Sequence, residues 1–316
     1  MLDFLIRRAL QSLLLLLLVS VIAFLLLHLA PGGPLAQYAP SGDMSAEDAA
    51  RVEHLLGFDR PLPVQYFEWL TRMLAGDWGR SYRDQQPVLQ LIFMHVGATV
   101  QLMLASTLLA MLLGIWTGII TGIRRYGLID TTFTVLSMIA ISVPTFWLGF
   151  ILIYVFAIQL EWLPAGDRFT IGDGSLHDYV IHMIAPVAVL TLVSTASWSR
   201  YMRSSVIDVM NQDFVRTARS KGLSERYILY RHIVRNALLP MITLAGLELR
   251  TIFSGALVTE TVFTWPGIGR LFYESITYSD YPTVMGILVF ASGTVVIGNA
   301  IADILYAKVD PRIRLS

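Results

Sequence analysis

Long apolar runs constrain this chain more than any other feature of its sequence. A transmembrane helix needs about 20 mostly apolar residues. Six segments meet this requirement, and they cover residues 9–30, 98–122, 132–157, 183–200, 237–260 and 284–306. Only 15% of the residues are charged and the mean hydropathy is +0.62, whereas a soluble domain holds about 25% charged residues. The sequence therefore predicts an all-α polytopic membrane protein with six transmembrane helices.

The first apolar run resembles a secretory signal at its start, because Arg7 and Arg8 precede it. A signal peptide, however, has a shorter apolar region and ends at a small-residue cleavage site. Here the run extends to residue 30, about 33 Å as a helix, and is followed by "PGGP". We interpret it as an uncleaved first span.

Orientation follows from the Lys and Arg content of the short loops, which is higher on the cytoplasmic side. Fifteen such residues lie in the N-terminus, the second and fourth connections and the C-terminus, counting Arg200 at the edge of the fourth. The short loops 158–182 and 261–283 hold one each. Both termini are therefore predicted to be cytoplasmic. The 31–97 insert, which carries two amphipathic helical patterns, is predicted to face outward.

Several residues within the runs indicate contacts between spans. Glycine recurs every fourth residue at Gly114, Gly118 and Gly122, a spacing that lets a second helix approach closely. Pro144 and Pro186 are expected to kink the third and fourth spans.

Polar side chains within the runs are candidates for a pathway or for contacts between subunits. Thr191, Ser194 and Thr195 share one face of the fourth span; they either line a polar path or bond back to their own helix. Glu248 and Arg250 lie deeper in the fifth run and point to nearly opposite sides, so we expect each to pair with another helix. Glu260 lies near the end of that run, where contact with the membrane interface is the ordinary explanation.

The fourth connection contains a basic segment, "DFVRTARSKGLSERYILYRHIVRNALLP", at residues 213–240. Asp213 can cap a first helix, and Gly222 is placed to end it. Ser224 can cap a second helix that has Glu225 in its first turn and continues into the fifth run. The segment therefore predicts a helix, a glycine turn and a second helix at the membrane surface.

Two interpretations of this segment are open. A basic amphipathic helix can rest on anionic lipid, and this remains an alternative for the second helix. In the first helix Thr217, Ala218 and Ser220 instead offer small side chains beside the cations Arg216, Arg219 and Lys221. Small residues with projecting cations suit a groove on a protein better than burial among acyl chains.

The same segment, through "RTARSKGLSER" and "RHIVRNALLP", resembles the cytoplasmic coupling loop of ABC-importer permeases of the peptide, opine and nickel uptake group. Further likenesses to that group follow along the chain: "FLLLHLAPGGP", "LLGFDRPLPVQYFEWL", "GDWGRSY", "SVPTFWLGFIL", "ETVFTWPGIGRLFYESI", "DYPTVMG" and "DILYAKVDPRIR". The chain differs from the general coupling-loop pattern in having Arg216 and Thr217 where Glu and Ala are expected. The spacing from Gly222 to Pro240 is also longer.

The resemblance implies a permease of the type I ABC-importer fold in a bacterial plasma (inner) membrane. It implies a second, related permease, two cytoplasmic ATPases that carry ATP and Mg, and an external substrate-binding protein; lipid surrounds the chain. The cargo would be peptides, with nickel, glutathione or opine as alternatives. It also implies an N-terminal part over 1–97, a permease core over 98–306 with coupling loop 201–236, and a cytoplasmic tail over 307–316. The ATPase-docking residues would be Arg216, Thr217, Ala218, Arg219, Lys221, Gly222, Leu223, Ser224 and Arg226.

Other functional classes are disfavoured by residues that the chain lacks. Its two lysines, Lys221 and Lys308, are not followed by Ser or Thr, so an ATP-binding P-loop is excluded and no cofactor is expected. There is no cysteine, and the scattered histidines predict no metal site. An intramembrane protease lacks its serine motif, and an ion-coupled secondary transporter lacks inverted repeats. Zero net charge implies no general attraction to nucleic acid.

The predicted external loops are acidic, with fourteen Asp or Glu against seven Arg. We hypothesise that this face, including residues 166–174, docks the binding protein; plain solvation of the loops is the alternative.

Overall fold

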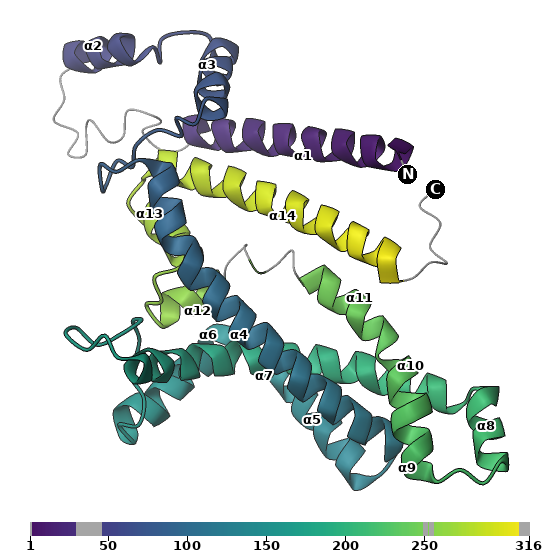
Figure 1. Cartoon of the computed structure of the whole chain (residues 1–316). Helices are drawn as coiled ribbons and strands as arrows, with labels where there is room; N and C mark the ends of the chain where they lie inside the picture. The colour runs from purple at the N-terminus through teal and green to yellow at the C-terminus, as the bar shows by residue number, and fades with distance from the viewer. Residues whose placement is uncertain (1, 30–45, 249–251, 253–255, 310–316) are drawn as a thin grey trace.

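The protein is described here by a computed structural model that covers residues 2–29, 46–248, 252 and 256–309 (Figure 1). The described part is built of helices joined by short connections, and its β-structure is confined to one isolated bridge between Arg80 and Pro87. In chain order the elements are α1 (Leu2–Leu29), α2 (Ala46–Leu56), α3 (Leu62–Leu74), α4 (Val88–Ile123), α5 (Leu128–Ser142), α6 (Thr145–Leu152), the π-helix η2 (Ile153–Gln159), α7 (Leu176–Met210), α8 (Asp213–Ser220), α9 (Glu225–Ile228), the π-helix η3 (Leu229–Val234), α10 (Arg235–Ala237), α11 (Leu239–Glu248), α12 (Leu257–Val262), α13 (Ile268–Thr277) and α14 (Tyr281–Val309). The prediction of an all-α protein is confirmed.

Four of the described helices, α1, α4, α7 and α14, are each long and apolar enough to cross a membrane. A fifth span results if α5 and the α6–η2 segment are counted together, although they are bent by 101°. The bend lies at Pro144, whose ring disfavours a helical conformation in the residue before it, and Val143 is accordingly extended. The kink predicted at Pro144 is confirmed, and it divides the predicted span 132–157 between α5 and the α6–η2 segment.

The fifth predicted span, 237–260, is not one helix. Its described residues form α11, which has ten residues, and the start of α12, which has six. Ala256 precedes α12 with φ −109° and ψ 70°, which is not helical. Residues 249–251 and 253–255, including Arg250, lie outside the described part. Apolar composition gave no warning of this break, because hydropathy does not record backbone conformation.

The predicted fourth span, 183–200, is part of a much longer helix. α7 has 35 residues and passes through Pro186 without ending. Ser175 caps its first turn by accepting a hydrogen bond from the Asp178 amide at 3.2 Å. At about 1.5 Å per residue, α7 is longer than the hydrocarbon core is thick. It therefore extends beyond the membrane and carries the segment that follows it.

The glycine repeat lies where α4 packs on α7, as predicted. A Cβ atom on Gly118 would lie 2.6 Å from the Cβ of Met202 and 2.7 Å from the carbonyl oxygen of Ser199. A Cβ on Gly122 would lie 2.8 Å from a methyl carbon of Val206. Only glycine fits at these distances, so the repeat sets how closely the two helices approach.

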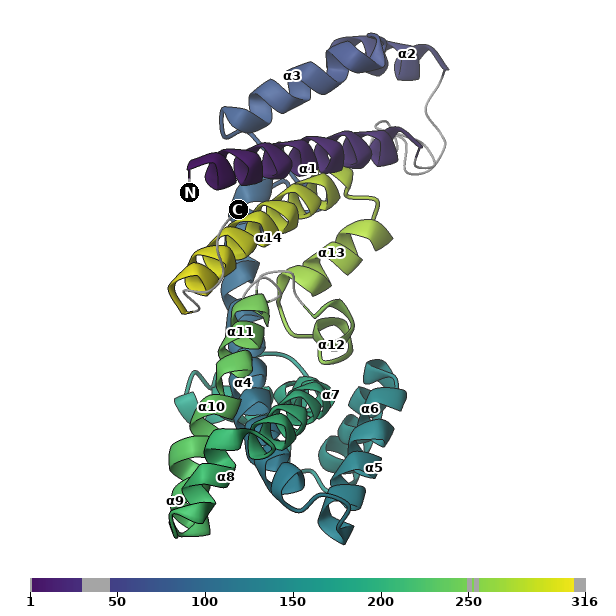
Figure 2. The same ribbon diagram turned by 90° about the vertical axis from the view of Figure 1, so that its right-hand side faces the viewer.

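Figure 1 shows that the start of α1, the end of α14 and the α8–α9 turn lie toward one end of the molecule. The insert helices α2 and α3, together with α12 and α13, lie toward the opposite end. In Figure 2 α7 lies between α4 on one side and the α5–α6 pair on the other, and α1 runs beside α14. The elements predicted to be cytoplasmic are thus gathered together, and so are those predicted to be external.

Candidate functional site

The basic segment forms the predicted pair of short helices, α8 and α9. The N-cap of α8 is Gln212, so the prediction that Asp213 caps the helix is wrong by one residue. Asp213 lies in the first helical turn, where its charge is favourable. Ser224 is the N-cap of α9 as predicted, but its side chain makes no capping hydrogen bond.

The turn between the two helices depends on Gly222, whose φ is +74°. The Gly222 amide donates to the carbonyl of Arg219 at 2.9 Å, and the Leu223 amide donates to the carbonyl of Ala218 at 3.4 Å. These two bonds form a Schellman motif, which satisfies the last carbonyls of α8 and requires a left-handed residue at Gly222. The predicted role of Gly222 in ending the first helix is confirmed.

One face of this helix pair is buried against the long helix α7. Val215 and Ala218 of α8 belong to an apolar cluster with Trp198, Met202 and Val206 of α7. Ala218 is only 5% exposed, so the expectation that it contributes to a docking surface is wrong. Residues three apart lie on the same helical face, and Val215 already marks that face as apolar. The sequence contained this signal.

The second helix is widened into a π-helix over Leu229–Val234, where a continuous α-helix was predicted. Ile228, Ile233 and Ala237 are all buried in the same cluster. In an α-helix residues five apart point in different directions, but the i→i+5 bonding of a π-helix brings Ile228 and Ile233 into line. The Ser205 hydroxyl also donates to the buried carbonyl of Ala237 at 2.9 Å.

The opposite face of the pair is exposed and basic. Arg219 donates through Nε and one Nη to the two carboxylate oxygens of Glu225, at 2.9 and 3.3 Å, and so joins α8 to α9. Arg216 lies 3.8 Å from Asp213. Within the described part of the chain, Lys221 and Arg226 are exposed and make no ion pair. Thr217, Gly222, Leu223 and Ser224 are exposed too. The pair therefore has two different faces. The exposed face, which we call the cationic edge, carries Arg216, Arg219, Lys221 and Arg226. The buried face, which we call the apolar foundation, consists of Val215, Ala218 and Ile228 packed on α7.

The residues predicted for a pathway are not gathered in one open site. Thr191 is buried and donates to the Ser106 carbonyl of α4 at 3.4 Å. The Thr195 hydroxyl is buried without a hydrogen-bond partner in the described part of the structure, and Ser194 is half-buried. Glu248 is half-buried at the end of α11 and has an interaction there.

An ion pair that the sequence reasoning missed links α5 to α7. Arg203 donates from Nε and Nη2 to the two carboxylate oxygens of Asp130 at 2.7 and 2.8 Å, and the carboxylate also accepts the Tyr126 amide. Beside the pair lies a cavity of about 250 Å³, whose lining includes Thr134 and Ser199. The sequence did offer a signal for this pair, because Asp130 and Arg203 lie at the same predicted end of the apolar runs 132–157 and 183–200.

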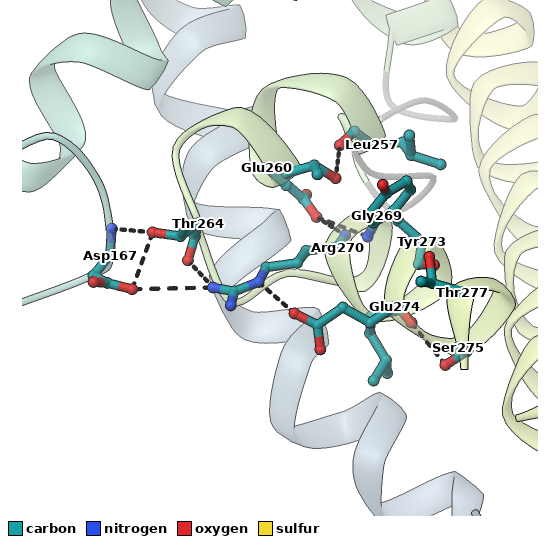
Figure 3. Close-up of polar contacts among 12 residues, drawn as sticks. Asp167, Leu257, Glu260, Thr264, Gly269, Arg270, Tyr273, Glu274, Ser275 and Thr277 are labelled. Carbon is teal, nitrogen blue, oxygen red and sulfur yellow. Dashed lines mark hydrogen bonds and ion pairs between the residues drawn. The ribbon is translucent and has the colours of Figure 1, made fainter. Parts of the chain in front are cut away.

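At the other end of the molecule a buried carboxylate organises the α12–α13 hairpin (Figure 3). Glu260 is 0% exposed, so the expectation that it contacts the membrane interface is wrong. One of its oxygens accepts from the Thr99 hydroxyl at 2.9 Å, and the other accepts from the Gly269 and Arg270 amides at 2.7 and 3.2 Å. Because these amides lie in the first turn of α13, Glu260 caps that helix and joins it to α4.

A second set of polar contacts holds three segments together at this end of the molecule. Glu274 of α13 accepts from Arg83 of the insert and from Arg270, each at 2.7 Å. Burial opposes ionisation of Glu274, but the two guanidinium groups hold its pKa below the usual value. Arg270 also donates to the Thr264 carbonyl, and the Thr264 hydroxyl donates to Asp167 at 3.0 Å (Figure 3).

Another buried carboxylate ties the insert to α14. Asp280 is 1% exposed and accepts from the Ser81 hydroxyl, the Tyr82 amide and the Thr283 hydroxyl, at 2.6 to 2.8 Å. The insert is therefore not a free appendage where it joins α4. Among the described residues, no cluster of His, Asp and Glu side chains is arranged to hold a metal ion.

Two family descriptions together match nearly the whole sequence. Residues 110–315 match "Binding-protein-dependent transport system inner membrane component", and residues 1–105 match the N-terminal family of such membrane components. An oligopeptide transport system permease protein of Bacillus subtilis is 41% identical over 315 residues, which cover 99% of each chain. A glutathione transport system permease protein of Salmonella typhimurium is 35% identical, again over 99% of each chain.

The fold is also similar to that of solved transporters. A chain of the MetNI methionine ABC transporter, in an inward-facing conformation, superposes with a TM-score of 0.56 at 16% identity, covering 70% of this chain and 97% of that one. A chain of an amino acid ABC transporter superposes with a TM-score of 0.52 at 16% identity, covering 70% of this chain and 93% of that one.

Proposed function

Since this chain belongs to the family of binding-protein-dependent transport system inner membrane components, we propose that it forms one side of a pathway that carries peptides across the membrane. Its relatives make it a multi-pass permease of the peptide group of ABC importers, a transport subunit and not a catalytic one. Peptides are the proposed cargo because the B. subtilis relative is an oligopeptide permease. Glutathione, nickel and opines are the alternatives.

The observation that carries the proposal is the exposed cationic edge of α8–α9 on a buried apolar foundation. We propose that this pair docks a cytoplasmic ATPase through Arg216, Thr217, Arg219, Lys221, Gly222, Leu223, Ser224 and Arg226. Ala218 would act from below, by fixing α8 on α7. A second, related permease would present an equivalent pair to a second ATPase. ATP and Mg would then be held by these partners, because this sequence has no P-loop.

The apolar foundation supplies a physical link from the ATPase to the membrane spans. Val215, Ala218 and Ile228 share one cluster with Met202 and Val206 of α7, so a displaced α8–α9 pair displaces α7 with it. Packed interiors transmit such displacements because they have little free volume. Closure of the ATPases would therefore bias the pathway between its two orientations. The proposal requires both termini and α8–α9 to lie in the cytoplasm, and the charge distribution supports that orientation.

We propose that the opposite end of the molecule docks the external binding protein. Asp167 anchors the loop at residues 166–174 to the α12–α13 hairpin, and the insert is joined to the same hairpin through Arg83. Beyond this anchor Phe169 is 53% and Ile171 is 98% exposed. Large apolar side chains held out on a fixed loop are typical of a binding surface more than of a solvated one.

The substitution Gly222→Asp tests the ATPase-docking proposal. A side chain at φ +74° costs roughly 1–2 kcal/mol, and an added Cβ meets no other described atom within 4 Å, so the strain falls on the turn itself. We expect normal abundance in the membrane and intact pairing of the permeases. The ATPases should be lost on purification, and peptide uptake should be lost with them.

Gly76→Asp is the matched control, because Gly76 has φ +93° and is equally open but lies in the external insert. This variant should keep its ATPases. Full ATPase retention and full uptake in Gly222→Asp would contradict the proposed docking site.

A further inference from the structure

An apolar groove between α1, α3 and α14 is not used by the proposed transport mechanism. It has a volume of about 490 Å³. Its walls come from the middle of two membrane-spanning helices and from the second half of α3 in the insert. The lining residues are Leu13, Leu16, Leu17, Ser20, Tyr66, Leu70, Met73, Leu74, Trp78, Val289, Phe290, Gly293, Thr294 and Ile297.

The hydroxyl groups in the groove are already satisfied by the protein. Ser20 donates to the carbonyl of Leu17 and shares a hydrogen bond with the Tyr66 hydroxyl, both at 2.8 Å. Thr294 donates to the carbonyl of Ala291 at 2.8 Å. A ligand in the groove therefore meets no hydroxyl that still needs a partner, and the hydrophobic effect would provide its binding energy.

The groove opens onto a surface that faces lipid. Leu13 and Leu17, which line it, are 64% and 47% exposed, and they belong to a helix with leucines exposed on all sides. A helix that is apolar all round faces either a protein core or lipid. Leu74 of α3 is 75% exposed at the margin of the same groove. The membrane surface of α1 thus continues into the groove without interruption.

The composition of the groove also argues against a second permease as its occupant. Helices that pack together in membranes use small residues at the contact, and this chain does so at Gly114, Gly118 and Gly122 in the α4–α7 interface. The groove is instead lined mainly by Leu, Met, Phe and Ile, with Gly293 its one glycine.

One end of the groove borders a polar cavity. Trp78 lines both spaces, and the cavity of about 500 Å³ beyond it is lined by Arg72 and Arg80 as well as by Glu68 and Asp77. Arg72 lies 4.0 Å from the Glu68 carboxylate, and Arg80 donates to the Gln85 carbonyl at 3.0 Å. Tryptophan is common at the level of lipid headgroups, and arginine binds phosphate well. We infer that the groove holds one acyl chain of a phospholipid, with the phosphate beside Trp78 and near these two arginines.

Such a lipid would act as part of the structure. It would fill the space between α3 and the two spans, and so hold the insert against α1 and α14. The site does not depend on the proposed cargo or on ATPase docking. Its test can therefore fail while the transport proposal stands.

Photochemical labelling tests this inference. The intact importer complex is placed in bilayers that contain phosphatidylethanolamine with a diazirine in one acyl chain, and adducts are mapped by peptide mass spectrometry. We expect adducts at residues 70–74 and 289–297. Gly293→Phe should abolish most of them, since no other described atom lies within 4 Å of a Cβ at Gly293 and the ring can fill the groove. Met73→Trp fills the groove from α3 and serves if the first variant does not insert.

Gly97→Phe is the control, because Gly97 is exposed on α4 and equally open but lies outside the groove. It should leave the adducts unchanged. Arg72→Glu should weaken labelling by the phospholipid but not by a diazirine-bearing diacylglycerol, which lacks phosphate. Equal labelling in Gly293→Phe and Gly97→Phe would overturn the inference, and so would crosslinks from Leu74 to a second permease.

Discussion

The α8–α9 pair and the α12–α13 hairpin are both short helical pairs at the ends of long spans, yet they are fixed in different ways. Apolar side chains hold α8–α9, with Val215, Ala218 and Ile228 buried on α7. The α12–α13 hairpin also buries apolar side chains, among them Trp265 and Ile268, but it is held in addition by hydrogen bonds to buried carboxyl groups, with Glu260 as the central acceptor. The first pair packs mainly on one helix, α7, whereas the second joins several segments that are distant in sequence.

This difference indicates what each pair is suited to do. Apolar contacts are not directional, so α8–α9 can move together with α7 as one body and can transmit a displacement. Hydrogen bonds require particular distances and angles, so α12–α13 keeps its geometry only while α4, the insert and the loop at residues 166–174 stay in place. The first arrangement suits a coupling element, and the second suits a fixed docking platform.

The substitution expected to have the largest effect is Glu260→Ala. It leaves the Thr99 hydroxyl and the Gly269 and Arg270 amides without their acceptor in a buried place, and each unpaired donor costs about 1–3 kcal/mol. We expect a large fall in membrane abundance and in the temperature of unfolding followed by tryptophan fluorescence. The molecules that do fold should keep their ATPases, because α8–α9 does not depend on this network. Abundance equal to that of the wild type would show that the network is dispensable.

The opposite pair should be most sensitive to Val215→Asp. Val215 is 0% exposed, and an unpaired carboxylate is disfavoured there. The loss is limited to the docking of α8, worth about 1.5–3 kcal/mol for one valine, because the helix can detach from α7 while the spans stay packed. We expect faster trypsin cleavage after Arg216 in inside-out vesicles and loss of the ATPases.

Phe214→Asp is the control for that substitution, since Phe214 is 44% exposed on the same helix. Its cleavage rate should stay close to that of the wild type. Equal rates in the two variants would mean that burial of Val215 does not hold α8 on α7.

The sequence predicted one pair much better than the other. Gly222 and Ser224 predicted the turn of α8–α9 correctly, because capping residues act on the backbone next to them. The structure has α8 before these residues and α9 after them. The N-cap of α8 was misplaced by one residue, and the buried role of Ala218 was misjudged although Val215 three residues earlier revealed the apolar face. The π-helical turn at η3 depends on contacts with α7, which local pattern does not contain.

Little of α12–α13 could be predicted. The partners of Glu260 include Thr99, which is 161 residues away, and no local pattern links the two. The broken fifth span escaped notice for a related reason. Hydropathy is additive over a window and does not distinguish one long helix from two short ones. The kink at Pro144, by contrast, was predicted because proline acts on its own backbone.

Lowering the pH should weaken the α12–α13 hairpin but have a smaller effect than the two substitutions above. The pKa of Glu274 is lowered in the folded protein by Arg83 and Arg270. Its contribution to stability is therefore complete above the unfolded value near 4.5 and is lost as the pH falls through the lower, folded pKa. At pH values below about 4.5 we expect the free energy of unfolding of the wild type to decrease by more than that of Glu274→Gln, by about 1 kcal/mol or less. The unfolding temperature of the wild type should decrease more in the same pH range. Parallel curves would mean that Glu274 contributes nothing.

The smallest effect on stability is expected where the α8–α9 pair does use a polar contact. Arg219 and Glu225 form an exposed pair with two hydrogen bonds, and such pairs contribute about 0.2–1 kcal/mol. Arg219→Glu should therefore leave folding nearly intact, and the double variant with Glu225→Arg should restore the contact between the helices. ATPase retention is the informative measurement. If Arg219 acts only by joining α8 to α9, the exchanged pair should restore retention; if its charge also contacts the ATPase, retention should stay low and the wild-type complex should weaken with added salt. Our docking proposal expects the second result. Full rescue, independent of salt, would mean that Arg219 only joins the two helices, and it would leave Arg216, Lys221 and Arg226 as the cations of the docking surface.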